Sequence, residues 1–265
     1  MYKKRILIWL LAAIPTAVCG QHVSGKSFKG FKGTIVIYDQ GADKYITHNE
    51  DRAATPYSPF STYKIPHSII ALETKIISNT EQIIQWEEKK YPAETWWPKT
   101  WAGEHNLRSA IKFSVVPAYR HLATLIGDSV MQRYVDRFEF GNKDISSGLD
   151  SFWLNGSLRI TAYEQVAFLK KFYNSQLKIS AQTERNVKNI LLQEQTENYK
   201  LSAKTGGGTI GRDQSAALGW YVGYLEKADN VYFFALNIEG NSFNEILKPR
   251  VLITKSIFRA LGIIQ

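Results

Sequence analysis

Strand-like and helix-like segments lie in different parts of this 265-residue chain, and this separation constrains its fold most. Runs rich in β-branched and aromatic residues lie towards both ends, at residues 34–39, 44–48, 200–204, 218–225 and 231–239. Apolar residues recur at helical spacing at residues 117–138, 164–173, 181–192 and 250–261, with a break at Gly127-Asp128-Ser129. Strands that are segregated from helices favour an antiparallel sheet over alternating β-α-β units. We therefore predict an α+β fold, with an antiparallel sheet flanked by helices plus a helical subdomain.

The predicted sheet draws its strands from both ends of the chain, so its part of the domain is expected to be discontinuous. Residues of about 31–60 and 196–265 would form this sheet part, and residues of about 75–175 would form the helical subdomain. Within the latter, residues 75–113 are rich in tryptophan and proline, which predicts irregular structure with short helices. One domain spanning residues 21–265 accommodates both parts, because a hydrophobic content of 44% is enough for a sizeable core.

Residues 1–20 have the organisation of a secretory signal peptide. Basic residues at positions 3–5 precede an apolar stretch at residues 6–18, which is short for a membrane span and is interrupted by Pro15. Small residues around Cys19 permit cleavage near this point, with an uncleaved N-terminal anchor as the alternative. Because Cys19 is the only cysteine, the mature chain is expected to fold without disulfides.

Neither the charge nor a local motif favours a nucleic-acid or nucleotide partner. The formal net charge is +9, but the basic residues are scattered among acidic ones instead of gathering on one segment. Residues 20–27 match the phosphate-loop pattern G-x-x-x-x-G-K-S. That pattern requires a helix directly after the loop, and here a strand-like run begins almost at once. We interpret the match as accidental.

The stretch Ser61-Thr62-Tyr63-Lys64 is the first candidate for catalytic chemistry. It lies between a turn-like segment and an apolar run, which predicts a loop that enters a buried helix. Residues three apart share one helix face, so Lys64 can reach the Ser61 hydroxyl and act as the base that activates it. The spacing alone is weak, because Ser175 and Lys178 share it and fit an exposed helix surface equally well.

Three further stretches could complete a site with Ser61. Ser114-Val115-Val116 offers a second hydroxyl that relays a proton, or else a helix cap. Lys204-Thr205-Gly206, followed by Gly207, offers charge, a hydroxyl and open backbone to a substrate carboxylate, or else a hairpin turn. Trp153 offers one indole N–H donor, or else an ordinary core side chain. On local grounds each plainer explanation stays open.

Taken together and in this order, the motifs resemble those of the class D β-lactamases, a family of penicilloyl-serine transferases. The resemblance runs from about residue 31 to residue 262. Its motifs are Ser61-Thr62-Tyr63-Lys64-Ile65-Pro66, Ser114-Val115-Val116, Phe140-Gly141-Asn142, Phe152-Trp153-Leu154, Lys204-Thr205-Gly206 and Gly219-Trp220-Tyr221-Val222-Gly223. One departure is Phe140, where the family usually has tyrosine; its ring can still pack, but it has no hydroxyl.

The resemblance implies a role for each candidate residue in the hydrolysis of β-lactams. Ser61 would be the nucleophile, and its backbone N–H and that of Gly207 would form the oxyanion hole. Lys64 would react with CO2 to give a carbamate, the general base. Ser114 would transfer a proton. Val116 would give the carbamate an apolar surround, and Trp153 would donate a hydrogen bond to it. The substrate carboxylate would be bound by Lys204, Thr205, Gly206 and Arg250.

The resemblance also implies the partners and the competing functions. We expect small-molecule β-lactam substrates, no cofactor apart from CO2 on Lys64, no metal, a periplasmic location without stable membrane insertion after signal cleavage, and either a monomer or a homodimer. One alternative is the penicillin-sensing domain of a receptor, which normally follows a long multi-span membrane segment. Another is a cell-wall transpeptidase, whose second motif usually ends in asparagine where this chain has Val116.

Overall fold

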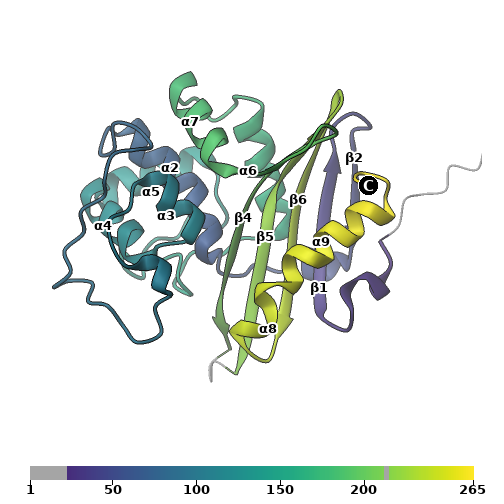
Figure 1. Cartoon of the computed structure of the whole chain (residues 1–265), viewed down its shortest axis with the longest axis horizontal. Helices are drawn as coiled ribbons and strands as arrows, with labels where there is room; N and C mark the ends of the chain where they lie inside the picture. The colour runs from purple at the N-terminus through teal and green to yellow at the C-terminus, as the bar shows by residue number, and fades with distance from the viewer. Residues whose placement is uncertain (1–22, 212–214) are drawn as a thin grey trace, which may run out of the picture.

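The computed structural model describes residues 23–211 and 215–265 (Figure 1). The predicted signal peptide lies outside these residues, as do residues 212–214. Within the described part of the chain, no helix is both long and apolar enough to cross a membrane.

An antiparallel sheet with the strand order β2-β1-β6-β5-β4-β3 forms the centre of the molecule (Figure 1). Its strands are β1 (Lys32–Asp39), β2 (Lys44–His48), β3 (Leu192–Gln195), β4 (Lys200–Ile210), β5 (Ala216–Lys227) and β6 (Asn230–Gly240). The N-terminal hairpin β1–β2 joins the C-terminal strands through the pairing of β1 with β6. This arrangement confirms the predicted α+β fold and the shared sheet.

The helices correspond closely to the predicted periodic segments. They are α1 (Glu50–Ala53), α2 (Lys64–Glu73), α3 (Leu107–Phe113), α4 (Val116–Ile126), α5 (Asp128–Phe138), α6 (Ala162–Tyr173), α7 (Ala181–Leu191), α8 (Phe243–Leu247) and α9 (Pro249–Ala260), with 3-10 turns η1 (Gly25–Phe28), η2 (Phe60–Tyr63) and η3 (Lys99–Trp101). The predicted break is real, because Gly127 has a positive φ of 79° and separates α4 from α5. Thr161 and Glu164 form a capping box that fixes the start of α6.

Helices cover both faces of the sheet, and the burial pattern of β5 reflects this (Figure 1). On one face α6 packs against β1, β5 and β6, with the helices α2–α5 and α7 beyond it; α8 and α9 lie on the other face. Trp220 and Val222 belong to the first core, whereas Tyr221 and Leu225 belong to the second. Because successive strand side chains point to opposite faces, a strand buried on both sides becomes a continuous apolar run.

Two sequence predictions differ from the structure at the strands. The strand predicted at residues 200–204 continues to Ile210, because Gly206, Gly207 and Gly208 pair with β5 instead of forming a turn. Consecutive glycines usually interrupt a strand, because their backbone is conformationally free. Here hydrogen bonds to the neighbouring strand β5 hold them in an extended conformation. The short edge strand β3 was not predicted, since its sequence Leu-Gln-Glu-Gln has little β propensity.

The phosphate-loop match has no nucleotide-binding context in the described residues. Residues 25–28 form the single 3-10 turn η1, and Ser24 caps this turn by accepting a hydrogen bond from the Lys26 N–H. Strand β1 begins only a few residues later, at Lys32. The helix that would hold phosphate groups is therefore missing at this position.

Candidate active site

Ser61 and Lys64 lie where η2 runs directly into α2. Lys64 is the first residue of α2, and its Nζ donates a hydrogen bond of 3.0 Å to Ser61 Oγ. The Lys64 side chain is fully buried. Burial disfavours the ammonium form and lowers the pKa of Lys64 from 10.5 to about 7. A substantial fraction of neutral amine near pH 7 is therefore available beside the Ser61 hydroxyl.

The turn that carries Ser61 is fixed by hydrogen bonds from two distant segments. Phe60 has a positive φ of 48°, and its N–H donates to the Trp153 carbonyl at 3.0 Å. Ser58 Oγ donates to the same carbonyl at 2.9 Å and accepts from the Asn155 N–H at 2.8 Å. Trp220 Nε1 in β5 donates to the Ser58 carbonyl at 2.9 Å. These contacts hold the left-handed residue before Ser61 in a conformation that a phenylalanine rarely adopts.

Lys204 connects the second motif with the third. Its Nζ donates hydrogen bonds to Ser114 Oγ and, at 2.8 Å, to the Thr205 carbonyl. Ser114 has a positive φ of 57° at the C-terminal end of α3, which places it outside the helical ladder. Burial, with further contributions from the charges of Lys64 and Arg250, lowers the pKa of Lys204 well below its ordinary value. The structure therefore brings the hydroxyls and amines of the three motifs into one site.

Close approach between β4 and the serine turn explains two of the glycines. A Cβ at Gly206 would lie 2.8 Å from the Pro59 carbonyl oxygen and 2.9 Å from the Thr62 backbone nitrogen. A Cβ at Gly207 would lie 2.8 Å from the Leu218 carbonyl oxygen and 2.9 Å from Arg250 Nη1. Either contact is too short for a real side chain, so only glycine lets the strand pass here. Arg250 Nη1 in turn donates a hydrogen bond of 2.5 Å to the Gly206 carbonyl, and burial lowers the pKa of Arg250 to about 10.

The outer edge of β4 is open where it passes the serine turn. The edge strand β3 pairs only with residues 200–202 at the start of β4. Beyond that point no described strand pairs with the outer edge of β4, which passes η2, whereas its inner edge stays paired with β5. Backbone N–H groups at such an edge, like those in the first turn of a helix, are available to an oxyanion. This geometry suits the predicted oxyanion hole at Ser61 and Gly207.

Trp153 and Val116 pack in the same apolar core as Tyr119, whose ring borders the pocket of Lys64. Trp153 is fully buried and stacks on Tyr63 at 5.6 Å between ring centroids. Its Nε1 has no hydrogen-bond partner among the described residues. Val116, at the start of α4, is half-buried against the same core cluster. A buried donor without an acceptor is costly, so this indole N–H is available to an acceptor that enters the pocket.

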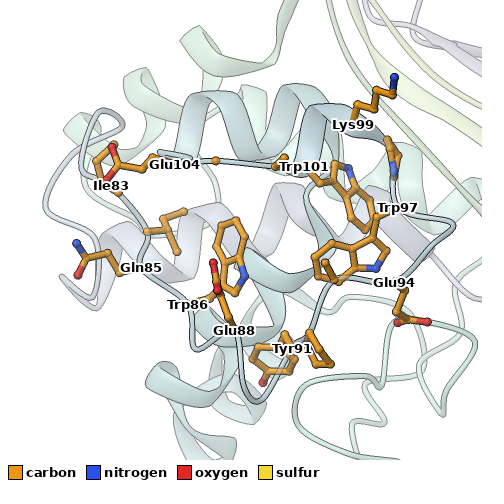
Figure 2. A pocket seen from close by; sticks show the side chains of 16 residues that line it. Ile83, Gln85, Trp86, Glu88, Tyr91, Glu94, Trp97, Lys99, Trp101 and Glu104 are labelled. Carbon is orange, nitrogen blue, oxygen red and sulfur yellow. The ribbon is translucent and has the colours of Figure 1, made fainter.

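The tryptophan-rich segment lines an open cavity of about 730 Å³ (Figure 2). Trp86, Trp97 and Trp101 line it from residues 83–104. Trp101 Nε1 donates a hydrogen bond of 2.9 Å to the carbonyl of Phe113, the residue before Ser114. This segment was predicted as irregular with short helices, and it contains η3 and leads into α3. Trp101 therefore supports the backbone that positions Ser114.

No metal centre was predicted, and the described residues contain no group of three or more His, Cys, Asp or Glu side chains that could hold an ion.

Comparisons with known proteins match nearly the whole chain. Residues 32–261 match the penicillin binding protein transpeptidase domain family. The β-lactamase OXA-48 of Klebsiella pneumoniae is 38% identical over 88% of this chain and 84% of its own. The crystal structure of the class D β-lactamase YbXI from Nostoc superposes with a TM-score of 0.83 at 37% identity, covering 90% of this chain and 98% of that one. This chain belongs to the class D β-lactamases. FUS-1 (OXA-85), a class D β-lactamase from Fusobacterium nucleatum subsp. polymorphum, agrees, with a TM-score of 0.83 at 35% identity over 89% of this chain and 95% of that one.

One similar protein does not carry the name β-lactamase. The methicillin resistance mecR1 protein of Staphylococcus aureus is 36% identical over 80% of this chain. The matched region makes up only 35% of that protein. The class D β-lactamases, in contrast, match this chain over most of their own length.

Sequence reasoning on this class D β-lactamase did not single out His67. This histidine lies three residues after Lys64 in α2 and is fully buried. The available signal was its position on the same helix face as Lys64, within an otherwise apolar run. A buried histidine is unremarkable by itself, and only the packing around it makes it noteworthy.

Proposed function

We propose that this chain hydrolyses β-lactams through an acyl-enzyme on Ser61. The observation that carries the proposal is the fully buried Lys64 amine, whose pKa is lowered to about 7 and which lies 3.0 Å from the Ser61 hydroxyl. An amine with a pKa near the working pH is an effective base for a weak nucleophile. The membership in the class D β-lactamases supports the same reaction.

In acylation, a base at Lys64 takes the Ser61 proton and Ser61 Oγ attacks the β-lactam carbonyl. The backbone N–H groups of Ser61 and Gly207 stabilise the oxyanion at the open edge of β4. Ser114 Oγ, already hydrogen-bonded to Lys204, passes a proton to the ring nitrogen as the C–N bond breaks. This transfer completes ring opening without a metal.

Lys204, Thr205 and Arg250 hold the substrate carboxylate. The Lys204 amine and the Thr205 hydroxyl extend from β4 beside Ser114. Arg250 lies behind the strand, bonded to the Gly206 carbonyl. Because Arg250 is buried, water screens its charge little, and this charge attracts the substrate carboxylate. The site therefore favours β-lactams that carry a carboxylate.

The pocket around Lys64 fits a carbamate formed with CO2. A carbamate requires a neutral amine, which burial provides, and a hydrogen-bond donor for the anion. Trp153 Nε1 is a buried donor that lacks an acceptor among the described residues. Val116, which packs against the same core, would add to the apolar surround. When present, the carbamate would supply an oxygen base that stays unprotonated at neutral pH, where an ordinary lysine amine is protonated. Trp153 would donate a hydrogen bond to that base and orient it towards water as well as towards Ser61.

Two alternatives remain, of which a penicillin sensor has the more specific support. The matched region is only 35% of the mecR1 protein, which is much longer than this chain. A sensor would be acylated once, without turnover. A transpeptidase shares the family of residues 32–261, but Val116 gives no hydrogen bond to a substrate where that class usually has asparagine. Both alternatives differ from a hydrolase in the fate of the acyl-enzyme.

A steady-state assay separates these functions. Residues 21–265 should hydrolyse many equivalents of a chromogenic cephalosporin, and Ser61→Ala should abolish turnover. Ser175→Ala is the matched control, because Ser175 has the same spacing to Lys178 but is exposed. It should retain wild-type rates. A burst of one equivalent followed by no turnover would refute the hydrolase and favour the sensor.

The location and assembly of the protein are part of the proposal. The basic and then apolar character of residues 1–20 supports export to the periplasm, where β-lactams reach their targets. The substrates are small molecules, and either a monomer or a homodimer is compatible with a site built within one chain. Fractionation of cells that express the full chain, with activity measured in the periplasmic extract, tests this location.

A further inference from the structure

His67 is a buried imidazole that the reaction as described so far does not use. It lies in α2, one turn after Lys64 and on the same face of the helix. Its side chain is fully buried, and neither Nδ1 nor Nε2 has a hydrogen-bond partner among the described residues. Buried polar nitrogens are nearly always paired, so two unpaired ones on a single ring need an explanation.

The rings around His67 also border Lys64. Tyr119 lies 5.2 Å from the imidazole between centroids, and the same Tyr119 ring lies 5.0 Å from Lys64 Nζ. Trp153 lies 5.2 Å from the imidazole in an edge-to-face arrangement. His67, Lys64 and the indole of Trp153 therefore belong to one pocket.

The other polar groups of this pocket already have partners. The Tyr119 hydroxyl and Ser68 Oγ are 2.7 Å apart, and the Tyr63 hydroxyl donates to Met131 Sδ at 3.1 Å. The nitrogens left over are those of His67 and the Nε1 of Trp153. Around Lys64 the pocket thus offers N–H donors that have no acceptor among the described residues.

The imidazole is neutral in this environment. Burial, together with the positive charge of Lys64, lowers the pKa of His67 to about 3. A neutral imidazole carries one N–H donor and one acceptor nitrogen. It can therefore donate a hydrogen bond without adding a second buried charge beside Lys64.

We propose that His67 is a positioning residue that donates a hydrogen bond to the carbamate of Lys64, together with Trp153. This inference rests on the proposed function, because the carbamate is part of it. The neutral Lys64 amine attacks the carbon of CO2, the N–C bond forms, and one N–H proton leaves to solvent, which gives N–COO⁻. The two carbamate oxygens supply the acceptors that His67 and Trp153 lack.

Two substitutions separate hydrogen bonding from packing. His67→Asn keeps an N–H donor in a smaller side chain, whereas His67→Leu keeps apolar volume without a donor. We would titrate each protein with sodium [13C]bicarbonate at about pH 8 and follow the carbamate carbon by NMR, since Lys64 is largely neutral there. His67→Leu should need about tenfold more bicarbonate for half-saturation, as expected for the loss of one hydrogen bond to a charged group. His67→Asn should stay within about threefold of the wild type.

Stability without CO2 distinguishes this role from a structural one. In CO2-free buffer His67→Leu should be at least as stable as the wild type, because it removes unpaired buried nitrogens. A purely structural histidine would instead lose stability in the leucine variant and leave the bicarbonate titration unchanged. Equal half-saturation in wild type and His67→Leu overturns the proposal.

The proposal stays testable if His67→Leu does not fold. The 15N signals of the His67 ring in the wild-type protein, identified by their loss in His67→Asn, should shift when bicarbonate is added. No shift while the carbamate signal appears overturns the role of His67 alone. No carbamate signal in the wild type overturns both the carbamate and this inference. Turnover of a β-lactam, measured separately, would then show that the hydrolase itself stands.

Discussion

Replacing Lys64 by methionine tests how much stability the buried amine costs. Methionine has a similar length and is a good helix former, so it suits the start of α2 and its apolar pocket. Burial lowers the pKa of Lys64 from 10.5 to about 7. At about 1.4 kcal/mol per pKa unit, this difference corresponds to a cost of about 5 kcal/mol when the lysine is fully protonated.

The cost depends on pH in a defined direction. Since the folded protein binds this proton more weakly than the unfolded chain does, stability is lost as the pH falls from 10.5 towards 7. The cost is nearly complete at pH 6, at about 5 kcal/mol, and it falls to about 2 kcal/mol at pH 9. The advantage of Lys64→Met over the wild type should therefore shrink by about 2.5 kcal/mol between these two pH values.

Urea unfolding of both proteins at pH 6 and pH 9 measures this difference. The buffers must be free of CO2, because a ligand that binds only the folded state raises its stability. Lys204 is also buried, but it titrates in both proteins, so most of its effect cancels in the stability difference between Lys64→Met and the wild type. Lys89→Met is the matched control, since Lys89 is exposed and its removal should change stability by less than about 0.5 kcal/mol. A gain that does not depend on pH, or a methionine variant less stable than the wild type at pH 6, would refute the reasoning.

Three other changes test the site directly. Arg250→Ala should raise KM for carboxylate-bearing β-lactams about tenfold with a smaller effect on kcat, because the attraction between Arg250 and the substrate carboxylate exists in both the bound substrate and the transition state. An unchanged KM would contradict this role of Arg250. Gly206→Ala should push β4 from the serine turn and lower kcat/KM at least about tenfold, whereas Gly25→Ala, where a Cβ has ordinary contacts, should not. Trp153→Ala should slow deacylation more than acylation, so that mass spectrometry finds trapped acyl-enzyme; prompt regeneration of free enzyme would argue against the carbamate. Wild-type activity should fall as Lys64 protonates below about pH 7 and should partly return when bicarbonate is added. A rate that does not respond to bicarbonate would also argue against the carbamate.

Local sequence signals were sufficient where the decisive interactions are local. The break at Gly127, the hairpin β1–β2 and the spacing of Ser61 and Lys64 depend on neighbours within a few residues. For such features, turn chemistry and periodicity reflect the forces that act in the folded protein. The order of the motifs then indicated the family, which the comparisons confirm.

Features decided by distant contacts could not be predicted from spacing. The extension of β4 through Gly208 depends on its pairing with β5, and the left-handed Phe60 depends on the Trp153 carbonyl, more than 90 residues away. The environment of His67 forms only when the rings of Tyr63, Tyr119 and Trp153 pack around it. In each case tertiary structure overrides a local preference or creates an environment that no short window contains.

The pairing of β1 with β6 sets the order in which this protein can be completed during synthesis. Ile35 lies opposite Leu236, about 200 residues later in the chain. A ribosome therefore finishes almost the entire polypeptide before the first strand meets its inner partner, and the hairpin emerges long before that edge can be covered. Long-range closure of this kind slows folding and lengthens the interval in which a chaperone can bind the unfolded chain. The same strand order that buries β6 at the centre of the finished sheet thus leaves the inner edge of β1 unpaired until most of the chain has been made.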